Sequence, residues 1–292
     1  MGKCIICQKE IFKKSHIRPV SVYDKRSYDL IKCENCKTLF TYPVPSQDEI
    51  DQIYKEQYFY GAHKITVGEK RYRAKKMASY VSRFSSIKTA LDVGSMYGFL
   101  IDELNRRNIR CAGIDIDPEA VAYCKKNNIP VESISLEGYL EKPGGSHDLI
   151  ILSHVLEHLF DPKEKLIAIR EKLNDGGKLL IAVPNIEAWT RKIFGNYWGY
   201  WDVPIHLTHF NKSTLRNLLE SSGFEIVDVR TVGGSSLLFF STLAKMLRKS
   251  GGSFEITHAK KWLIGSISSI LKYWYNLGDD EILVVAKIKS KK

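Results

Sequence analysis

The chain has 292 residues, of which 44% are hydrophobic and 26% charged, and its formal net charge at pH 7 is +11. This length leaves room for one large domain with a small appendage, and the composition is typical of a folded soluble chain. No run of 18 uncharged apolar residues and no apolar segment of signal-peptide type is present. We therefore expect a cytoplasmic protein without a membrane-spanning helix.

The charge is unevenly distributed along the chain. Residues 1–88 carry a net charge of +9, residues 89–230 carry −4, and residues 231–292 carry +6. The basic ends suit an anionic partner such as a phosphate-bearing substrate, a nucleic acid or a membrane surface. The alternative is a solvated basic surface that only keeps the protein soluble.

Four cysteines near the N-terminus form two C-x-x-C pairs, Cys4 with Cys7 and Cys33 with Cys36, and 25 residues separate the pairs. Two such pairs are typical of a tetrahedral zinc site. Because four thiolates leave no open coordination position, we expect a structural zinc ion. A redox C-x-x-C or a chance pattern is the alternative.

The central motif is a glycine turn between two strands. Residues 90–93 form a short apolar strand, Gly94 and Gly98 bracket a turn, residues 99–107 have helical spacing, and a second apolar strand ends at Asp115. An acid at the end of the second strand is how a doubly wound sheet holds a ribose. The pattern predicts a nucleoside-binding half-fold, and a turn without a ligand is the alternative.

The turn lacks the G-x-G-x-x-G of dinucleotide-binding folds, and Asp92 precedes it. A carboxylate at this place suits a cationic ligand better than a pyrophosphate. Here the chain resembles the class I S-adenosylmethionine-dependent methyltransferases, whose first motif is an acid-x-Gly-x-Gly-x-Gly loop. Asp92, Gly94, Gly98 and Asp115 match the family pattern, whereas Met96 stands at the middle glycine.

Later elements continue the resemblance, which covers about residues 90–230 and includes the phrases SHVLEHL, LNDGGKLLIAVPN and HLTHF. It implies an α/β fold with a doubly wound, Rossmann-like sheet of seven strands. We expect Asp161 to cap a helix over 162–173, and residues 174–177 to end it. Strands are expected at 147–152, 178–183, 224–229 and 281–288, the last as an antiparallel edge strand, and a helix at 213–222. The residues that the resemblance assigns to the cofactor are Asp92, Gly94, Ser95, Gly98, Asp115, Ile116 and Ser153.

A histidine-rich motif follows the strand at 147–152. His154, Glu157 and His158 have the spacing of one helical turn. The motif resembles the E-x-x-E-H of magnesium-dependent O-methyltransferases, in which the Glu and His hold a metal that binds substrate hydroxyls. With His154 at the position of the first Glu, zinc or manganese is favoured over magnesium. A second divalent metal near Glu157 and His158 is therefore one hypothesis, and a hydrogen-bonded pocket wall is the other.

Residues 186–210 are rich in aromatic side chains and end with His206 and His209. Their place after the strand at 178–183 predicts a lid over the methyl donor, with aromatic walls that exclude water. We expect the catalytic residues to be His206, His209 and His154, with a lid histidine accepting the proton of an attacking hydroxyl. The alternative is an ordinary packed insertion.

The flanking segments complete the organisation. A Pro-rich turn and a Tyr-rich amphipathic segment follow the cysteines, and this layout resembles the N-terminal part of bacterial sugar and surface-polysaccharide methyltransferases. The expected domains are a zinc-ribbon module with connector (1–61) and the methyltransferase domain (62–292), which begins with a basic helix at 68–86. A helical insertion is expected at 231–280, where residues 235–277 would pack on the lid, on a partner in a homodimer, or on a membrane surface.

The sequence thus predicts methyl transfer from S-adenosylmethionine to a small polar acceptor, foremost a sugar or glycan precursor. One alternative is an RNA methyltransferase that uses the basic flanks and the zinc module. Another is a non-catalytic binding or scaffold protein that retains the fold.

Overall fold

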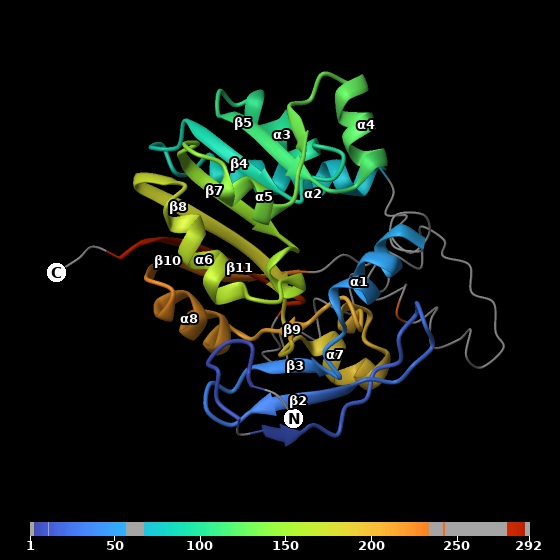
Figure 1. Ribbon diagram of the computed structural model, residues 1–292. Helices are drawn as coiled ribbons and strands as arrows, with labels where there is room; N and C mark the ends of the chain where they lie inside the picture. Colours follow the sequence, from blue (N-terminus) through green and yellow to red (C-terminus); the bar gives the residue numbers. More distant parts are fainter. Residues whose placement is uncertain (1–2, 11, 57–66, 234–241, 243–278, 290–292) are drawn as a thin grey trace.

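The computed structural model describes residues 3–10, 12–56, 67–233, 242 and 279–289. They form a seven-stranded sheet and a separate four-stranded sheet near the N-terminus (Figure 1). The strand order of the large sheet is β10-β11-β8-β7-β4-β5-β6. Its strands are β4 (Thr89–Val93), β5 (Arg110–Asp115), β6 (Val131–Ser133), β7 (His147–Ser153), β8 (Leu173–Pro184), β10 (Phe224–Val232) and β11 (Glu281–Ile288). The expected Rossmann-like α/β sheet is therefore confirmed.

The last strand does not lie at the edge of the sheet. β11 is antiparallel, as expected, but it pairs with β8 on one side and with β10 on the other. Its first six residues are all buried. A continuous apolar run of this kind belongs to a strand covered on both faces, so the edge prediction was wrong.

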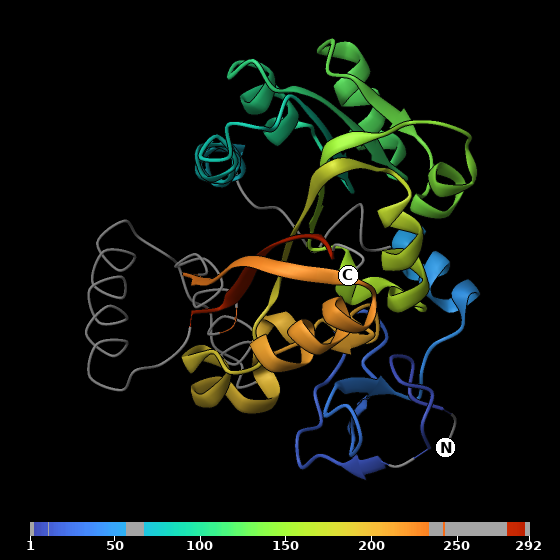
Figure 2. The ribbon, with the colours of Figure 1, turned by 90° about the vertical axis from the view of Figure 1, so that its left-hand side faces the viewer.

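Helices cover both faces of the large sheet, because successive strand residues point to opposite sides. One face, which includes Ala90 and Ile151, packs against α2 and α3, whereas the other, which includes Leu91 and Ile150, packs against α5, α6 and α8. Figure 2 shows α2 (teal) and α6 (yellow-green) on opposite sides of the sheet. The helix bounds are α2 (Val67–Val81), α3 (Phe99–Asn105), α4 (Pro118–Lys126), α5 (Leu136–Glu141), α6 (Pro162–Arg170) and α8 (Lys212–Ser221).

The helix before β8 ends earlier than expected. α6 ends at Arg170, and the side chain of Asp161 makes no capping hydrogen bond. Leu173 already pairs with His147, and residues 174–177 loop out before the regular register resumes at Lys178. The Asn-Asp-Gly-Gly sequence thus forms an irregularity within a strand, not the stop of a helix.

The N-terminal sheet is completed by a strand from the distant lid segment. Its order is β1-β2-β3-β9, and β9 pairs Thr208 with Phe40 and His209 with Leu39. The module expected at 1–61 is therefore not closed at its C-terminal boundary. The strand bounds are β1 (Phe12–Lys14), β2 (Asp29–Cys33), β3 (Leu39–Tyr42) and β9 (Thr208–His209), and α1 (Gln47–Ile53) follows with a capping box of Ser46 and Glu49.

The aromatic lid segment packs on this N-terminal sheet. Trp198 and Trp201 form one apolar cluster with Leu30 and Leu39, and both indoles are about 2% exposed. The N-terminal module, in turn, shares a core with the large sheet, since Phe40 and Phe210 belong to the same cluster as Val183. Trp198 and Trp201 are thus packing residues. The lid segment contains α7 (Trp189–Phe194) and two short 3-10 turns, Gly195–Tyr197 and Gly199–Trp201.

The insertion expected at 231–280 lies mostly outside the described residues. Thr231 and Val232 still belong to β10, and Thr242 accepts a hydrogen bond from the amide of Gly199. The membrane or dimer contact expected for 235–277 otherwise falls on residues that are not described. Within the described part of the chain, none of the helices has the length and apolarity needed to cross a membrane.

Asp148 ties together the starts of three strands. Its carboxylate accepts hydrogen bonds from the backbone amides of Lys88 and Thr89 and from Asn174 Nδ2 at 2.8–2.9 Å. Burial alone would raise the pKa of Asp148, but these hydrogen bonds lower it to about 2. We expect Asp148→Asn to reduce the free energy of unfolding by about 1–2 kcal/mol at pH 7, since one charged acceptor is lost. Urea unfolding at several pH values measures this difference.

The pH dependence of this stability difference tests whether the charge of Asp148 is its cause. Because the pKa of Asp148 is lower in the native than in the unfolded state, its contribution is complete above about pH 4 and is lost as the pH falls toward 2. The difference between the two proteins should therefore shrink over that range. Asp102→Asn removes an exposed i,i+4 pair with Arg106 and serves as the control, with an expected effect below about 0.5 kcal/mol. An equal loss in both variants would contradict the assignment.

Candidate active site

The site lies at the carboxyl ends of the parallel strands, where ligands of open α/β sheets bind. A cavity of about 2170 Å³ among the described residues is lined there by residues that follow β4, β5 and β7. β11 runs in the opposite direction, so its first residue, Glu281, lies at this same edge, opposite Pro184. Further walls come from α1, α2, the lid segment, the loop before β2, the start of α5 and the end of β10.

The turn after β4 has the backbone shape of a ligand-binding loop. Gly94 and Gly98 both have φ of +67°, and a Cβ on Gly98 would lie 2.5 Å from the side chain of Ile129. Met96, at the position of the family's middle glycine, also adopts a positive φ of +49°. The loop therefore keeps a glycine-type conformation although a larger side chain occupies it, at a cost of about 1–2 kcal/mol.

Asp115 holds this loop in place. Its Oδ2 accepts a hydrogen bond from the Met96 amide at 2.6 Å, and its Oδ1 accepts one from the Asp117 amide at 2.8 Å. Ser95 Oγ is buried beside the loop and has no hydrogen-bond partner among the described residues. A buried hydroxyl without a partner is costly, so this atom is suited to contact a ligand.

Asp92 lies at the base of the same loop. Burial, together with the nearby charge of Asp115, raises the pKa of Asp92 to about 8. The carboxyl group is 4% exposed. It therefore holds a proton near neutral pH until a positive charge is placed beside it.

The residues predicted for the cofactor lie around the cavity. Those that line it are Asp92, Gly94, Ser95, Asp115, Ile116 and Ser153. Gly98 supports the turn from behind as the N-cap of α3.

The histidine motif is not one helical turn. His154 has φ of +57°, and only residues Leu156–His158 form a short 3-10 turn. His154 still lies 3.2 Å from Glu157, measured from Nδ1 to Oε1, so the strained backbone brings the two side chains together. Burial lowers the pKa of His154, but the charges of Glu281 and Glu157 outweigh it and raise the pKa to about 9. A histidine that is already protonated is a poor proton acceptor at neutral pH.

Glu281, which the sequence analysis did not single out, connects His154 with Arg73 of α2 and with Tyr200 of the lid segment. Its Oε1 accepts hydrogen bonds from Arg73 of α2 and from the Tyr200 hydroxyl of the lid, and it lies 3.5 Å from His154 Nε2. The Tyr200 ring also stacks on the His154 ring. The signal that could have found Glu281 is its place as the first residue of an antiparallel strand.

Glu157, His158 and His206 form a compact group whose ligand atoms lie within 4.8 Å of one another. Glu157 Oε2 is buried and accepts no hydrogen bond from the described residues. Burial and the proximity of His206 lower the pKa of His158 to about 4, so this ring is neutral. His206 Nδ1 lies 2.9 Å from the carbonyl oxygen of Tyr200, which leaves its Nε2 for another partner. A neutral imidazole and a free carboxylate oxygen are the donors that a divalent metal requires.

His209 does not join the site. It is buried behind the cavity wall, with Nε2 3.0 Å from Thr41 Oγ1 and its ring against Trp201. Burial lowers the pKa of His209 well below its usual value. Of the two lid histidines, His206 lines the cavity and His209 does not.

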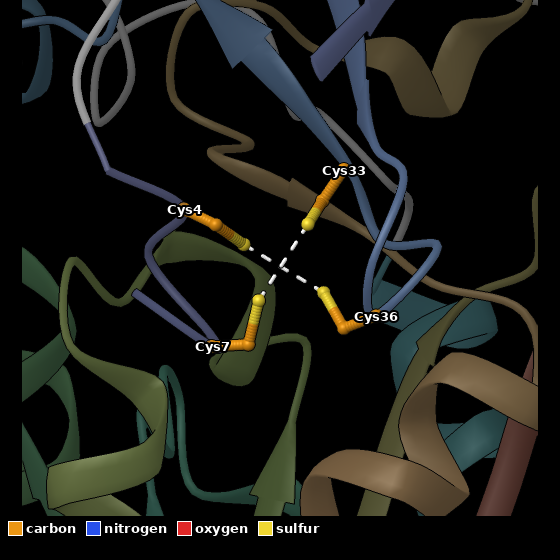
Figure 3. A group of neighbouring side chains, drawn as sticks. All are labelled: Cys4, Cys7, Cys33 and Cys36. Atoms are coloured by element: carbon orange, nitrogen blue, oxygen red, sulfur yellow. Dashed lines mark hydrogen bonds between the residues drawn. The ribbon is translucent and has the colours of Figure 1, made fainter. Parts of the chain in front are cut away.

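The four N-terminal cysteines converge on one point, as Figure 3 shows. The Sγ atoms of Cys4 and Cys36 are 3.6 Å apart, and those of Cys7 and Cys33 are 3.5 Å apart. Four sulfurs at about 2.3 Å from a tetrahedral zinc ion would be separated by about 3.8 Å. The cluster therefore fits that ion, and it lies away from the cavity.

Much of the sequence is similar to known methyltransferases. A family model described as a methyltransferase domain matches residues 70–229. A probable S-adenosylmethionine-dependent methyltransferase of Mycolicibacterium smegmatis is 24% identical over 213 residues, which cover 72% of this chain and 74% of that protein. A ubiquinone biosynthesis O-methyltransferase of Nitrosococcus oceani is 30% identical over 114 residues, which cover 36% of this chain and about half (48%) of that protein.

Solved structures share the fold. A SAM-dependent methyltransferase from Archaeoglobus fulgidus is 20% identical and superimposes with a TM-score of 0.54, covering 81% of this chain and 99% of that one. A magnesium protoporphyrin IX methyltransferase from Synechocystis, solved with bound SAH, is 11% identical, with a TM-score of 0.53 and coverage of 84% and 100%.

Asp92 should make the ligand-free protein less stable as the pH rises. Its pKa is near 8 in the native state and near 3.8 when unfolded, so the native state keeps a proton that the unfolded state has lost. Wild-type stability should therefore decline between about pH 4 and pH 8, and Asp92→Asn should remove that part of the decline. We expect the variant to be more stable by about 1–3 kcal/mol at pH 9, with a smaller difference at pH 5. Urea unfolding without ligand measures it, and a difference that does not change with pH would refute the role of the carboxyl group.

Proposed function

The chain belongs to the methyltransferase-domain family and is an S-adenosylmethionine-dependent methyltransferase, and from this premise we propose that it methylates a hydroxyl oxygen of a polyhydroxylated acceptor, a sugar or glycan precursor. The observation that carries the proposal is the group of Glu157, His158 and His206, in which the two histidines line the cavity and the buried Glu157 lies within 4.8 Å of them. The ubiquinone-pathway relatives, whose name specifies transfer to oxygen, support an oxygen acceptor. The alternative acceptor is RNA.

The glycine loop would hold the methyl donor. Asp115, at the end of β5, would accept from the ribose hydroxyls, and its present hydrogen bonds to the loop amides keep it oriented. Asp92 would face the methionine end, where a sulfonium charge favours the carboxylate over the protonated form. The residues proposed for the cofactor are Asp92, Gly94, Ser95, Gly98, Asp115, Ile116 and Ser153.

Glu157 Oε2 and the Nε2 atoms of His158 and His206 would hold a divalent cation, and their nitrogen and oxygen donors suit zinc or manganese at least as well as magnesium. When bound, such a cation lowers the pKa of a coordinated hydroxyl and so favours its loss of a proton. The second nitrogens of both rings are already fixed, since His158 Nδ1 lies 3.1 Å from the Ile205 carbonyl oxygen and His206 Nδ1 lies 2.9 Å from that of Tyr200. This arrangement orients the rings as ligands.

The chain's own contribution to the rate would be positioning. Glu157 and His206 would hold the acceptor oxygen beside Gly94 and Ser153, which line the same cavity, so that the oxygen lies in line with the methyl group. His154, held as a cation between Glu157 and Glu281, would keep the Glu157 carboxylate in place. Tyr54 and Tyr200 line the cavity, where their rings would limit the access of water.

We further propose that Cys4, Cys7, Cys33 and Cys36 bind a structural zinc ion, supported by the short distances between their sulfur atoms. We expect this cluster to hold one zinc ion per purified chain, apart from any ion at the Glu157 group. Cys33→Ser should lose the ion and lower the unfolding midpoint, because a closed thiolate site contributes directly to folding. Elemental analysis measures the zinc content. Cys111→Ala, at a buried cysteine of β5 outside the cluster, is the control and should retain the ion; equal zinc contents in all three proteins would contradict the proposal.

The acceptor and the second metal are tested together. The full chain is supplied with methyl-labelled S-adenosylmethionine, Mn²⁺ and a panel of nucleotide sugars, glycan precursors and RNA. We expect label on a sugar hydroxyl, and a loss of at least about 100-fold in kcat/KM for Glu157→Gln and His206→Ala, since each removes a ligand of the proposed cation. Both variants should also lose binding of Mn²⁺, followed by electron paramagnetic resonance.

His147→Gln is the matched control, because this histidine lies at the opposite end of β7 and contacts Tyr139. It should bind Mn²⁺ and turn over like the wild type. Labelling of RNA with a steep dependence on salt, and none of the sugars, would establish the alternative acceptor. Full turnover by Glu157→Gln would remove the metal from the proposal.

A further inference from the structure

The N-terminal module contacts the active site through Thr41, a buried residue of β3. Its side chain is directed at the lid segment, not at its own module. Thr41 Oγ1 donates a hydrogen bond to the carbonyl oxygen of His206 at 2.6 Å and lies 3.0 Å from His209 Nε2. The Thr41 amide donates to the carbonyl oxygen of Leu207 at 3.0 Å.

The same short segment is also bound to the histidine motif. The Leu207 amide donates to the carbonyl oxygen of Glu157 at 2.8 Å. Residues 206–209 are therefore held between the Glu157 loop on one side and β3 on the other. The Thr41 hydroxyl fixes the backbone of His206, whose ring lines the cavity.

The cysteine cluster lies close by along the same strand. The carbonyl oxygen of Thr38 accepts from the Cys33 amide at 2.9 Å, and the Thr38 hydroxyl lies 3.3 Å from Cys36 Sγ. β3 starts at the next residue, Leu39, and Thr41 is the third residue of the strand. The geometry at the cysteines thus sets the position of the strand that holds His206.

We propose that Thr41 is a positioning residue for methyl transfer, and that through it the cysteine module forms part of the active site. Thr41 acts on His206 through the backbone and touches neither substrate nor cofactor. The inference rests on the proposed function, because it takes His206 as a member of the reacting centre. It extends that function to a residue about 165 positions earlier in the chain.

The experiment compares three variants of the full chain. Thr41→Val removes the hydroxyl and keeps the shape, and Thr41→Ser keeps the hydroxyl. Thr208→Val is the matched control, because Thr208 lies in the same β3–β9 junction but its buried hydroxyl has no partner among the described residues. The first readout is the imidazole signal of His206 in protein labelled with ¹³C-histidine, assigned with His206→Gln and recorded without added metal. The second is the affinity for Mn²⁺.

We expect Thr41→Val to move the His206 signal and to weaken Mn²⁺ binding at least about tenfold, the usual effect of losing a group that orients a metal ligand. The affinity for S-adenosylmethionine should stay within about twofold. Thr41→Ser should restore both readouts, and Thr208→Val should change neither. If Thr41→Val does not fold, Thr41→Ala replaces it, because it places no methyl group against the His206 carbonyl oxygen.

The two readouts separate this inference from the proposed function. If the wild type does not bind Mn²⁺ and Thr41→Val alone moves the His206 signal, the positioning role stands and the second metal is lost. An unchanged His206 signal in Thr41→Val overturns the inference, whatever the Mn²⁺ affinity. An equal shift in Thr208→Val also overturns it, because any change at the junction would then have the same effect.

Discussion

The arrangement of the site depends on one residue that is hydrogen-bonded on both sides. Leu207 donates its amide hydrogen to Glu157 and accepts from the Thr41 amide with its carbonyl oxygen, and its side chain is 2% exposed. Through these two bonds the large sheet and the N-terminal sheet hold the same stretch of backbone. His206 precedes this point, and β9 follows it. Neither sheet could shift without moving the histidine or leaving a buried backbone group unpaired, which costs about 1–3 kcal/mol.

Three buried carboxyl groups at this edge, those of Glu281, Asp92 and Asp115, differ in whether neighbouring side chains stabilise their charge. Glu281 is stabilised within the protein, because Arg73 and His154 lower its pKa although burial opposes this. Asp92 and Asp115 are not stabilised to the same extent, and burial raises the pKa of both. Glu281, whose negative charge Arg73 and His154 stabilise, lies beside the lid. Asp92 and Asp115, whose pKa values are raised by burial, lie beside the glycine loop. This difference is expected where a cation binds at the loop and a preformed ion pair supports the wall.

Local spacing predicted the parts of the site that lie within one strand-turn-helix unit. Asp92, Gly94 and Asp115 could be placed because the carboxyl ends of parallel strands always meet at one edge. Arg73, Glu281 and Thr41 could not, because each reaches the site through long-range packing that leaves no periodic signal. The helical turn expected for His154 failed because a positive φ interrupts it. For the lid, composition alone could not separate Trp198 and Trp201, which are buried in the core with the N-terminal sheet, from Tyr200, whose ring stacks on His154 and whose hydroxyl donates to Glu281.

The two clusters of metal-ligating side chains differ in chemistry, and the difference determines what each can do. Four thiolates complete a tetrahedral shell, so a zinc ion bound by Cys4, Cys7, Cys33 and Cys36 has no position for substrate. Glu157, His158 and His206 offer three donors, and because His158 and His206 line the cavity, an ion held there would keep positions for a substrate. A closed cluster would influence the reaction only through the backbone it holds, and β3 connects that backbone to His206 through the Thr41 hydroxyl. The N-terminal residues and the lid thus share one sheet, and residues from both segments line the cavity.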